Sequence, residues 1–369
     1  MKFPHLIRPA KINEISILVE ALKKVYDSRV YILQEKFIQW AYNSPYNKDI
    51  IGNDELSVMC AFNQNSKIDA AIGFVPNKFF VDSKEVQSLW DINYNNFSKF
   101  PGLALECLKN LRKLVKVYSG NNLNKKCIRS YQRVFNKKNF KEEINRKIAI
   151  IDYDQCNKIT NPKNEEKVKN FLASNETQIK ETDFVEINSF YKISKKYWED
   201  HLKRFTFTYD RRIPYLEWRF LNHPYLKYHI ISTDEKASAG LAVVRVEKIK
   251  NLQLNFLRIL DLLPTNGNED DLQKIVLEFA KKNKCIVADF FCSSSSVINK
   301  ICFKPFLDFN DHKEYKIPHR LQPIEITEKN SFNLFLDLDS DLSVDSDELY
   351  STKTDGEGDL FLDQNVGFI

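Results

Sequence analysis

The sequence predicts an α/β (α+β) fold built from two tandem copies of one unit, followed by an acidic C-terminal tail. Three observations predict it: an internal repeat, the same order of apolar runs after each copy, and a change of charge late in the chain. The 369 residues leave room for two domains and a tail at about 150 residues per domain. We therefore expect units at 1–155 and 156–325 and a tail at 326–369.

A short aromatic box carries the repeat. Residues 37–46 read FIQWAYNSPY, and residues 215–225 read YLEWRFLNHPY. Both copies contain a Trp, an aromatic residue two positions later, a Pro and a Tyr, and the second copy has one residue inserted before the proline. The shared order indicates a duplicated unit.

Three short apolar runs separated by polar turns follow each box, which is typical of antiparallel strands. They lie at 56–62, 68–75 and 86–92 after the first box, and at 228–232, 239–246 and 256–262 after the second. Each set leads into an amphipathic helix, a buried strand and a short helix. These are 103–114, 114–118 and 125–135 in the first copy, and 272–279, 285–291 and 296–303 in the second; long helical stretches at 13–27 and 185–203 precede the units.

The composition is typical of a soluble globular protein: 43% hydrophobic, 28% charged and 13% aromatic residues. No run approaches the roughly 20 apolar residues of a membrane span, and the first residues show no secretory signal, so we expect a cytoplasmic protein. The seven cysteines form no C-x-x-C pair. We interpret them as reduced core residues and expect no metal site.

The net charge of +5 combines two opposite parts. From Leu334 onward there are ten acidic residues and one Lys, a net charge of −9, which leaves +14 for the rest. A basic body favours anionic ligands. The acidic tail spaces some carboxylates as a calcium loop does, but it has Leu342 where the sharp turn needs Gly; we expect a solvated tail, with folding onto the basic body as the alternative.

The order of elements resembles the GNAT acyltransferase superfamily, here in tandem, over about residues 3–317. More narrowly, the Trp-x-Tyr and Asn-Pro box resembles GNAT-like proteins of bacterial surface-polysaccharide gene clusters. The resemblance implies an acetyl-coenzyme A dependent N-acyltransferase without a metal. It also implies direct transfer to the amine of a small metabolite, with a nucleotide-linked amino sugar as the favoured class.

The resemblance also implies where the coenzyme binds. At the start of the first amphipathic helix, the chain carries the counterpart of the family's pyrophosphate-binding turn, whose amides bind phosphate at a helix N-terminus. The corresponding residues are Lys99, Pro101, Gly102, Leu103 and Ala104. In the second unit, Glu269, Asp270 and Asp271 at that place would repel a pyrophosphate, so we expect only the first unit to bind acyl-coenzyme A. A plain helix start is the alternative.

Three further residues take family roles by position. Asn124 corresponds to a residue that contacts the coenzyme arm, Tyr131 to a general acid that protonates the leaving thiolate, and Asp91 to a general base. Two alternatives stay open. Tyr131 is equally consistent with a packed core helix, and Asp91 recurs as Asp261, so the duplicated Asp fits a fold feature as well.

A polar and aromatic cluster in the second box is the candidate acceptor site, because Arg forks suit phosphate or carboxylate groups in a cleft between units. Its members are Arg211, Arg212, Trp218, Arg219 and His223. The alternative is that the aromatic members are repeated core residues.

Two other functions remain open. Fem-like aminoacyltransferases also pair two GNAT-like units, and the +14 body could accept charged tRNA. The second of these alternatives is a non-catalytic GNAT-like binding protein.

Overall fold

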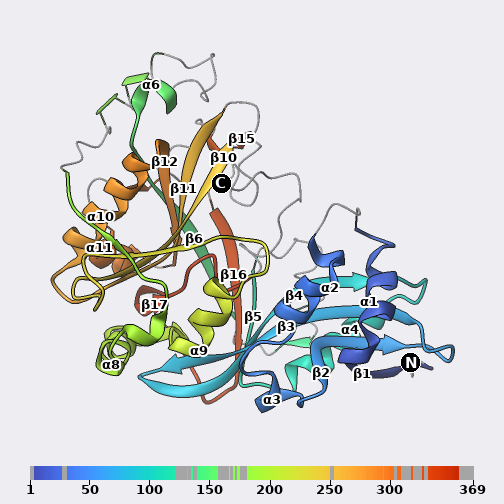
Figure 1. Ribbon diagram of the computed structural model, residues 1–369. Helices are drawn as coiled ribbons and strands as arrows, with labels where there is room; N and C mark the ends of the chain where they lie inside the picture. The colour runs from blue at the N-terminus through green and yellow to red at the C-terminus, as the bar shows by residue number, and fades with distance from the viewer. Residues whose placement is uncertain are drawn as a thin grey trace.

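The computed structural model describes residues 4–26, 31–121, 131, 134–135, 139–156, 166, 169–170, 173–174, 181–249, 253–293, 295–302, 306–308, 317–318, 326–327 and 331–356. Within these residues, the strands form one sheet of 15 strands and a separate two-stranded ribbon. The long sheet has the order β1-β2-β3-β4-β5-β16-β6-β12-β11-β10-β9-β7. It therefore runs without a break from the first half of the chain into the second (Figure 1).

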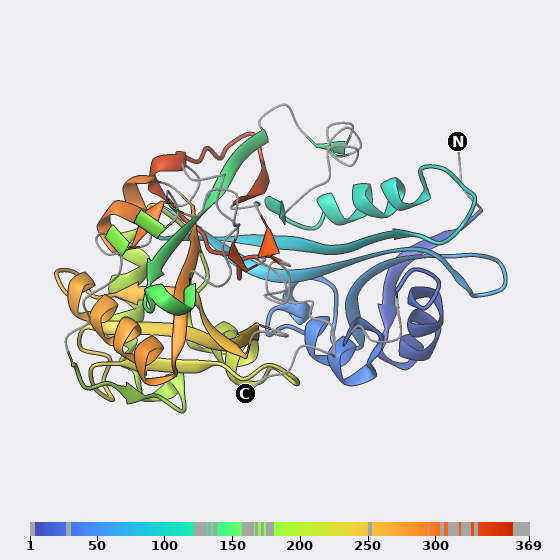
Figure 2. The same ribbon diagram turned by 90° about the horizontal axis from the view of Figure 1, so that it is seen from above.

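The first half contains β1 (Leu6–Lys11), η1 (Ile12–Glu14), α1 (Ile15–Leu22), η2 (Tyr31–Leu33), α2 (Glu35–Ala41), α3 (Asn47–Ile50), β2 (Glu55–Phe62), β3 (Ile68–Val81), β4 (Lys84–Asn96), α4 (Leu103–Arg112), β5 (Val117–Asn121), β6 (Asn139–Ile150) and α6 (Tyr153–Cys156). The predicted antiparallel meander is confirmed as β2, β3 and β4. Figure 2 shows α4 on one side of this sheet and α1 and α2 on the other.

The second half contains β7 (Val185–Glu186), η5 (Phe190–Lys192), α8 (Lys195–Arg204), β8 (Phe207–Tyr209), α9 (Ile213–Leu216), the π-helix η6 (Glu217–Leu221), β9 (His229–Ser232), β10 (Gly240–Ile249), β11 (Leu254–Pro264), α10 (Glu269–Lys282), β12 (Cys285–Cys292), α11 (Ser295–Ile301), β13 (Leu307–Asp308), β14 (Ile317–Pro318) and β15 (Ile326–Thr327). The second meander is likewise confirmed as β9, β10 and β11. The expected helix over 185–203 is shorter: α8 begins at 195, because the Ser194 side chain caps it by accepting the Tyr197 amide.

The C-terminal region contains β16 (Ser331–Leu338), η8 (Ser346–Glu348) and β17 (Leu349–Tyr350). β16 lies between β5 and β6 and is antiparallel to both. The prediction of a solvated tail is therefore wrong for 331–356. Leu334 and Leu336 are fully buried, and three of the acidic residues form ion pairs: Arg112 binds Asp337 and Asp339, and Lys116 binds Asp341.

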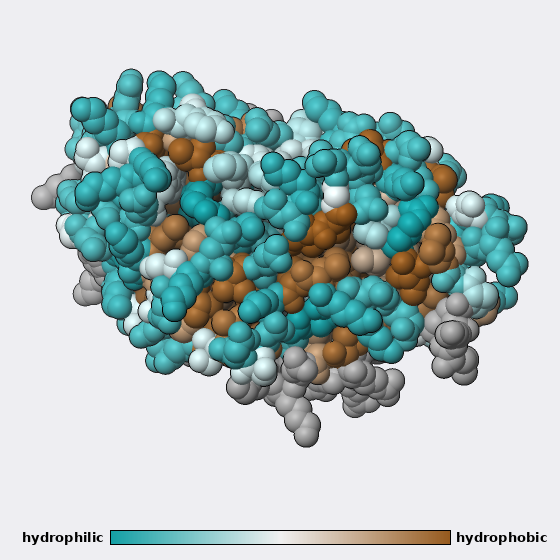
Figure 3. Space-filling view, turned by 90° about the horizontal axis from the view of Figure 1, so that it is seen from below, coloured by the Kyte–Doolittle hydropathy of each residue, from teal (hydrophilic) through white to brown (hydrophobic). Residues whose placement is uncertain are grey.

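The core continues through both halves, with buried side chains from α1, α2, β4, β10, β12 and β16 in one cluster. A second cluster packs α4 against the other face of the first-half sheet. The six described cysteines are buried thiols, as expected; Cys127 lies outside the described residues. No helix among the described residues is long and apolar enough to cross a bilayer. Figure 3 shows one face, with polar side chains around apolar ones in its middle.

The two copies of the aromatic box pack against each other. The indole rings of Trp40 and Trp218 stack with centroids 5.1 Å apart. Each indole N–H donates to the backbone oxygen of the other Trp, at 2.8 and 2.9 Å. This tryptophan contact relates the repeats reciprocally, as a local two-fold arrangement does.

Candidate active site

The parallel strands β4 and β5 pair over three positions only, from Ser88 opposite Val117 to Trp90 opposite Ser119. β4 continues to Asn96, while β5 turns to β16 as its partner. The carboxyl ends of parallel strands are the usual ligand-binding edge of an α/β sheet. Asp91 is the first residue of β4 beyond the paired stretch, so it lies where the two strands separate.

Asp91 is buried and accepts a hydrogen bond from the hydroxyl of Tyr131. Burial raises the pKa of Asp91 to about 6, and the hydroxyls of Tyr131 and Tyr118 lower it in opposition. A carboxyl with such a pKa exchanges protons near neutral pH, which is the property that a general base needs. The structure thus joins the two residues that the sequence assigned as base and acid.

Aromatic rings surround Tyr131, the hydrogen-bond partner of Asp91. The Tyr131 ring lies 5.2 Å from Phe135, 5.9 Å from Phe335 and 6.3 Å from Tyr118, measured between centroids. Phe335 belongs to β16, so the C-terminal region supplies one wall of this site. Apolar walls keep water from the carboxyl and account for its raised pKa.

A bulge follows Asp91 on the same strand. Ile72 pairs with Tyr94 and Gly73 with Ile92, which leaves Asn93 as the extra residue, with φ of +58°. Asn tolerates this left-handed conformation better than most residues. Its side-chain amide donates to the Tyr42 hydroxyl at 2.8 Å and accepts from the Tyr26 hydroxyl at 3.0 Å. The bulge is therefore fixed by the segment after α1 and by the box.

The start of α4 lies at the same edge, because it follows the end of β4. Gly102 is its N-cap with φ of +86°, and Pro101 precedes it. Lys99, Pro101 and Gly102 are exposed, whereas Leu103 and Ala104 are buried against the sheet. The exposed glycine turn and the positive end of the helix fit a bound phosphate group. Asn124 lies outside the described residues.

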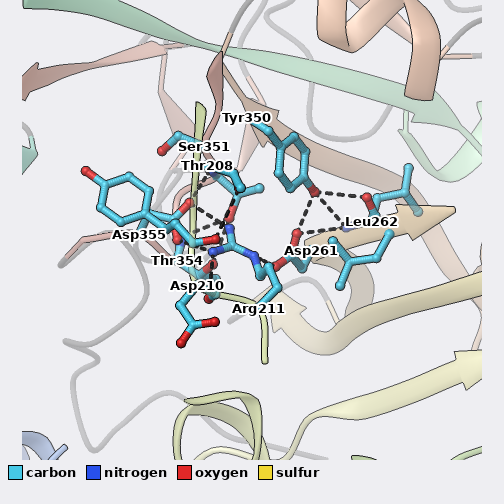
Figure 4. Close-up of polar contacts among 12 residues, drawn as sticks. Thr208, Asp210, Arg211, Asp261, Leu262, Tyr350, Ser351, Thr354 and Asp355 are labelled. Atoms are coloured by element: carbon cyan, nitrogen blue, oxygen red, sulfur yellow. Dashed lines mark hydrogen bonds and ion pairs between the residues drawn. The ribbon is translucent and has the colours of Figure 1, made fainter. Parts of the chain in front are cut away.

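The equivalent place in the second half is filled by the chain itself (Figure 4). Asp261 on β11 accepts from the Tyr350 hydroxyl at 2.5 Å and forms an ion pair with Arg211. Arg211 also makes a bidentate pair with Asp355, with both distances 2.7 Å. Burial raises the pKa of Asp261 to about 6 as well, and the Arg211 charge lowers it in opposition. Residues 349–356 thus occupy this second site.

The five predicted acceptor residues lie in different surroundings. Arg211 is buried between carboxylates, and Arg212, the most exposed of the five, pairs with Asp210 and Glu85 at 2.9 and 2.8 Å. Trp218 forms the tryptophan contact. The His223 Nδ1 accepts two backbone amides, and its ring lies 4.1 Å from the Trp40 ring. Arg219 is fully buried beside Trp40.

Sequence reasoning missed Tyr118, Phe335, Tyr350 and Asp355. The last three come from the region that composition alone assigned to solvent. A usable signal was present, since residues 331–338 read SFNLFLDL, a run of the kind that buried strands show. Among the described residues, no group of three or more metal-binding side chains is present.

No protein-family model and no curated protein matches the chain. Solved structures do match in fold. A GCN5-related N-acetyltransferase from Anabaena variabilis ATCC 29413 has a TM-score of 0.53 at 10% identity, covering 89% of this chain and 72% of its own. A conserved Enterococcus faecalis V583 protein of unknown function has 0.51 at 9%, covering 91% and 73%.

The N-myristoyltransferase of Saccharomyces cerevisiae, solved with myristoyl-CoA and inhibitors, has a TM-score of 0.50 at 11% identity, covering 95% of this chain and 86% of its own. At these identities the likeness concerns the fold. The chain therefore has the mixed α/β, tandem GNAT-like architecture.

Proposed function

We propose that the protein is an N-acyltransferase that takes an acyl-coenzyme A donor at the first half and transfers the acyl group directly to an amine. One observation carries the proposal: the hydrogen-bonded Asp91 and Tyr131 lie where β4 and β5 separate, at the same edge as the start of α4. The GNAT-like fold supports it.

When bound, the coenzyme supplies a thioester as acyl donor. Gly102 and the first amides of α4 hold its phosphates, and Lys99 adds positive charge at the rim. The ionised Asp91 carboxylate accepts a proton from the substrate ammonium, so that the free amine can attack. Tyr131 donates its hydroxyl proton to the departing sulfur and recovers one from Asp91 through their shared hydrogen bond. The nitrogen loses two protons as the ammonium becomes an amide: the Asp91 and Tyr131 pair moves one of them to sulfur, and the other is released to solvent.

Acetyl-coenzyme A is the donor that we propose, and a nucleotide-linked amino sugar is the acceptor class, acting in the cytoplasm. The resemblance of the sequence to GNAT-like proteins of surface-polysaccharide clusters supports this choice. The second half takes no donor in this proposal, because residues 349–356 fill its equivalent site and Glu269, Asp270 and Asp271 begin α10.

The test compares matched tyrosines, because each half holds a tyrosine hydroxyl on the equivalent Asp. Binding of acetyl-coenzyme A is measured by calorimetry, and release of free coenzyme A thiol is followed with a panel of amines that includes nucleotide-linked amino sugars. Tyr131→Phe should keep binding and lower turnover by about 100-fold or more. Tyr350→Phe should keep both.

The proposal would be ruled out if calorimetry detected no binding heat with any of three ligands at millimolar concentration: acetyl-coenzyme A, myristoyl-coenzyme A and free coenzyme A. Tight, salt-dependent binding of charged tRNA without coenzyme binding would instead favour the Fem-like alternative.

Donor binding is tested separately by charge reversal. Lys99→Glu should weaken acyl-coenzyme A binding several-fold, since a carboxylate there repels phosphate. Lys84→Glu is the matched control, because Lys84 is exposed at the opposite end of β4. Equal affinities of the two variants would place the phosphates elsewhere.

A further inference from the structure

The two copies of the aromatic box differ at one point. The first copy forms the regular helix α2, which ends at Ala41 directly after Trp40. The second copy has Arg219 directly after Trp218, and its extra residue lies within the π-helix η6. Single inserted residues are absorbed in this way, and π-helical turns occur often at functional sites. Arg219 is therefore a departure from the repeated core rather than a copy of it.

The Arg219 side chain is completely buried, and none of its three guanidinium nitrogens has a hydrogen-bond partner among the described residues. Its nearest described partners are aromatic faces, with the guanidinium carbon 5.9 Å from the Trp40 ring centre and 5.8 Å from that of Phe220. The hydroxyl of Tyr215, which feels the Arg219 charge, is also buried without a partner within the described part of the chain.

The neighbouring arginines show what a buried guanidinium normally requires. Arg211 has two carboxylates, Asp261 and Asp355. Arg212 has two as well, although it is partly exposed. Burying a charge without a counterion is strongly unfavourable, and a cation on an aromatic face recovers only part of the cost. An apolar side chain would serve packing better, as Ala41 does in the first copy.

Arg219 also lies beside the core cluster that contains Trp40, Trp218 and Trp90. It contacts Trp40 of the first half, and Tyr215 beside it neighbours Tyr209. Trp40, Tyr209 and Tyr215 belong to the same core cluster as Trp90, the residue before Asp91. A connected set of side chains therefore leads from Arg219 to the edge where β4 and β5 separate.

We propose that Arg219, with the Tyr215 hydroxyl, binds an anionic group of the acceptor substrate, a carboxylate or a phosphate. That the anion belongs to the acceptor rests on the proposed function. That Arg219 binds an anion at all rests on its buried charge alone. Since the guanidinium has no accessible surface, the anion reaches it only when the side chains around it move. Association should then be slower than free diffusion allows.

The test uses inorganic phosphate and acetate as probes, at constant ionic strength against chloride, with thermal unfolding of the full chain as the readout. A bound anion raises the midpoint in proportion to the logarithm of its concentration above Kd. We expect such a rise for the wild type, and the stronger of the two probes identifies phosphate or carboxylate. Arg219→Met should lose the rise and, without anion, unfold at the same or a higher temperature.

Arg8→Met is the matched control for the loss of one positive charge. Arg8 lies on β1 and already pairs with Glu14 of η1, so this variant should keep the anion-dependent rise. Equal anion responses in Arg219→Met and the wild type, or a lower midpoint of Arg219→Met without anion, would overturn the inference. Acyl-coenzyme A binding is measured on the same samples. Absence of that binding in the wild type counts against the proposed function, whereas absence of the anion response in the wild type counts against the role of Arg219 alone.

Discussion

At the scale of single residues, the proposed reaction depends on the Asp91 and Tyr131 pair. Their separation of 40 positions in sequence gave no indication of contact, yet the structure joins them by a hydrogen bond. The pKa of Asp91 near 6 comes from burial. The hydroxyls of Tyr131 and Tyr118, which lie far from Asp91 in the chain, oppose this effect, so the sequence could name the carboxylate but not its proton affinity.

The pH dependence of turnover follows from this pKa. Only ionised Asp91 accepts a proton, so kcat/KM should rise with pH and level off above an apparent pKa near 6. Asp91→Asn should lower kcat/KM by about 100-fold or more and remove that limb. A rate profile recorded from pH 5 to 9 measures both effects, and an unchanged acid limb in the variant would assign it to another group.

Asp91 also makes stability depend on pH. Its pKa is raised in the folded protein, so the native state holds this proton more tightly than the unfolded chain does. The resulting stabilisation is present below about pH 4, the pKa of a free Asp, and is lost as the pH rises toward about 6. Urea unfolding across this range should show a smaller decline in Asp91→Asn than in the wild type. Asp261 remains in both proteins as an internal reference.

At the scale of elements, the strand and helix order after each box was predictable, because alternating apolar runs and turn residues are local signals. The bulge at Asn93 was not, because it depends on pairing between β3 and β4. Gly73 on β3 shows why the pairing is specific. A Cβ there would lie 2.5 Å from the Tyr42 ring and 2.9 Å from the Ile92 carbonyl oxygen.

Gly73→Ala should therefore destabilise the protein by about 1–3 kcal/mol, through overpacking against Tyr42. Chemical denaturation measures the change. In a double-mutant cycle, Tyr42→Leu should relieve part of the cost, so that the double variant loses less than the sum of the single changes. Strict additivity would show that the ring is not the cause.

At the scale of the whole molecule, β16 completes the sheet between β5 and β6, and β6 in turn pairs with β12 of the second half. Leu334→Ala on β16 should cost about 2–5 kcal/mol, as other buried leucines do. Asp341→Asn, on an exposed side chain, should change the free energy of unfolding by less than about 0.5 kcal/mol. Denaturation curves of both variants decide whether this region is core, since a solvated tail would make the two changes equally small.

The sequence by itself determined the duplication and the type and order of most elements, because these depend on recurring and local patterns; the residues of the candidate acid, base and phosphate turn followed from its resemblance to the GNAT superfamily. Only the tertiary structure decided that β16 and residues 349–356 are buried, that Asp91 meets Tyr131, and that Arg211 pairs with carboxylates while Arg219 has no such partner among the described residues. These outcomes depend on which distant side chains share a buried volume. Burial and pairing set the energy of a charge, and neither can be read from the identity of the charged residue.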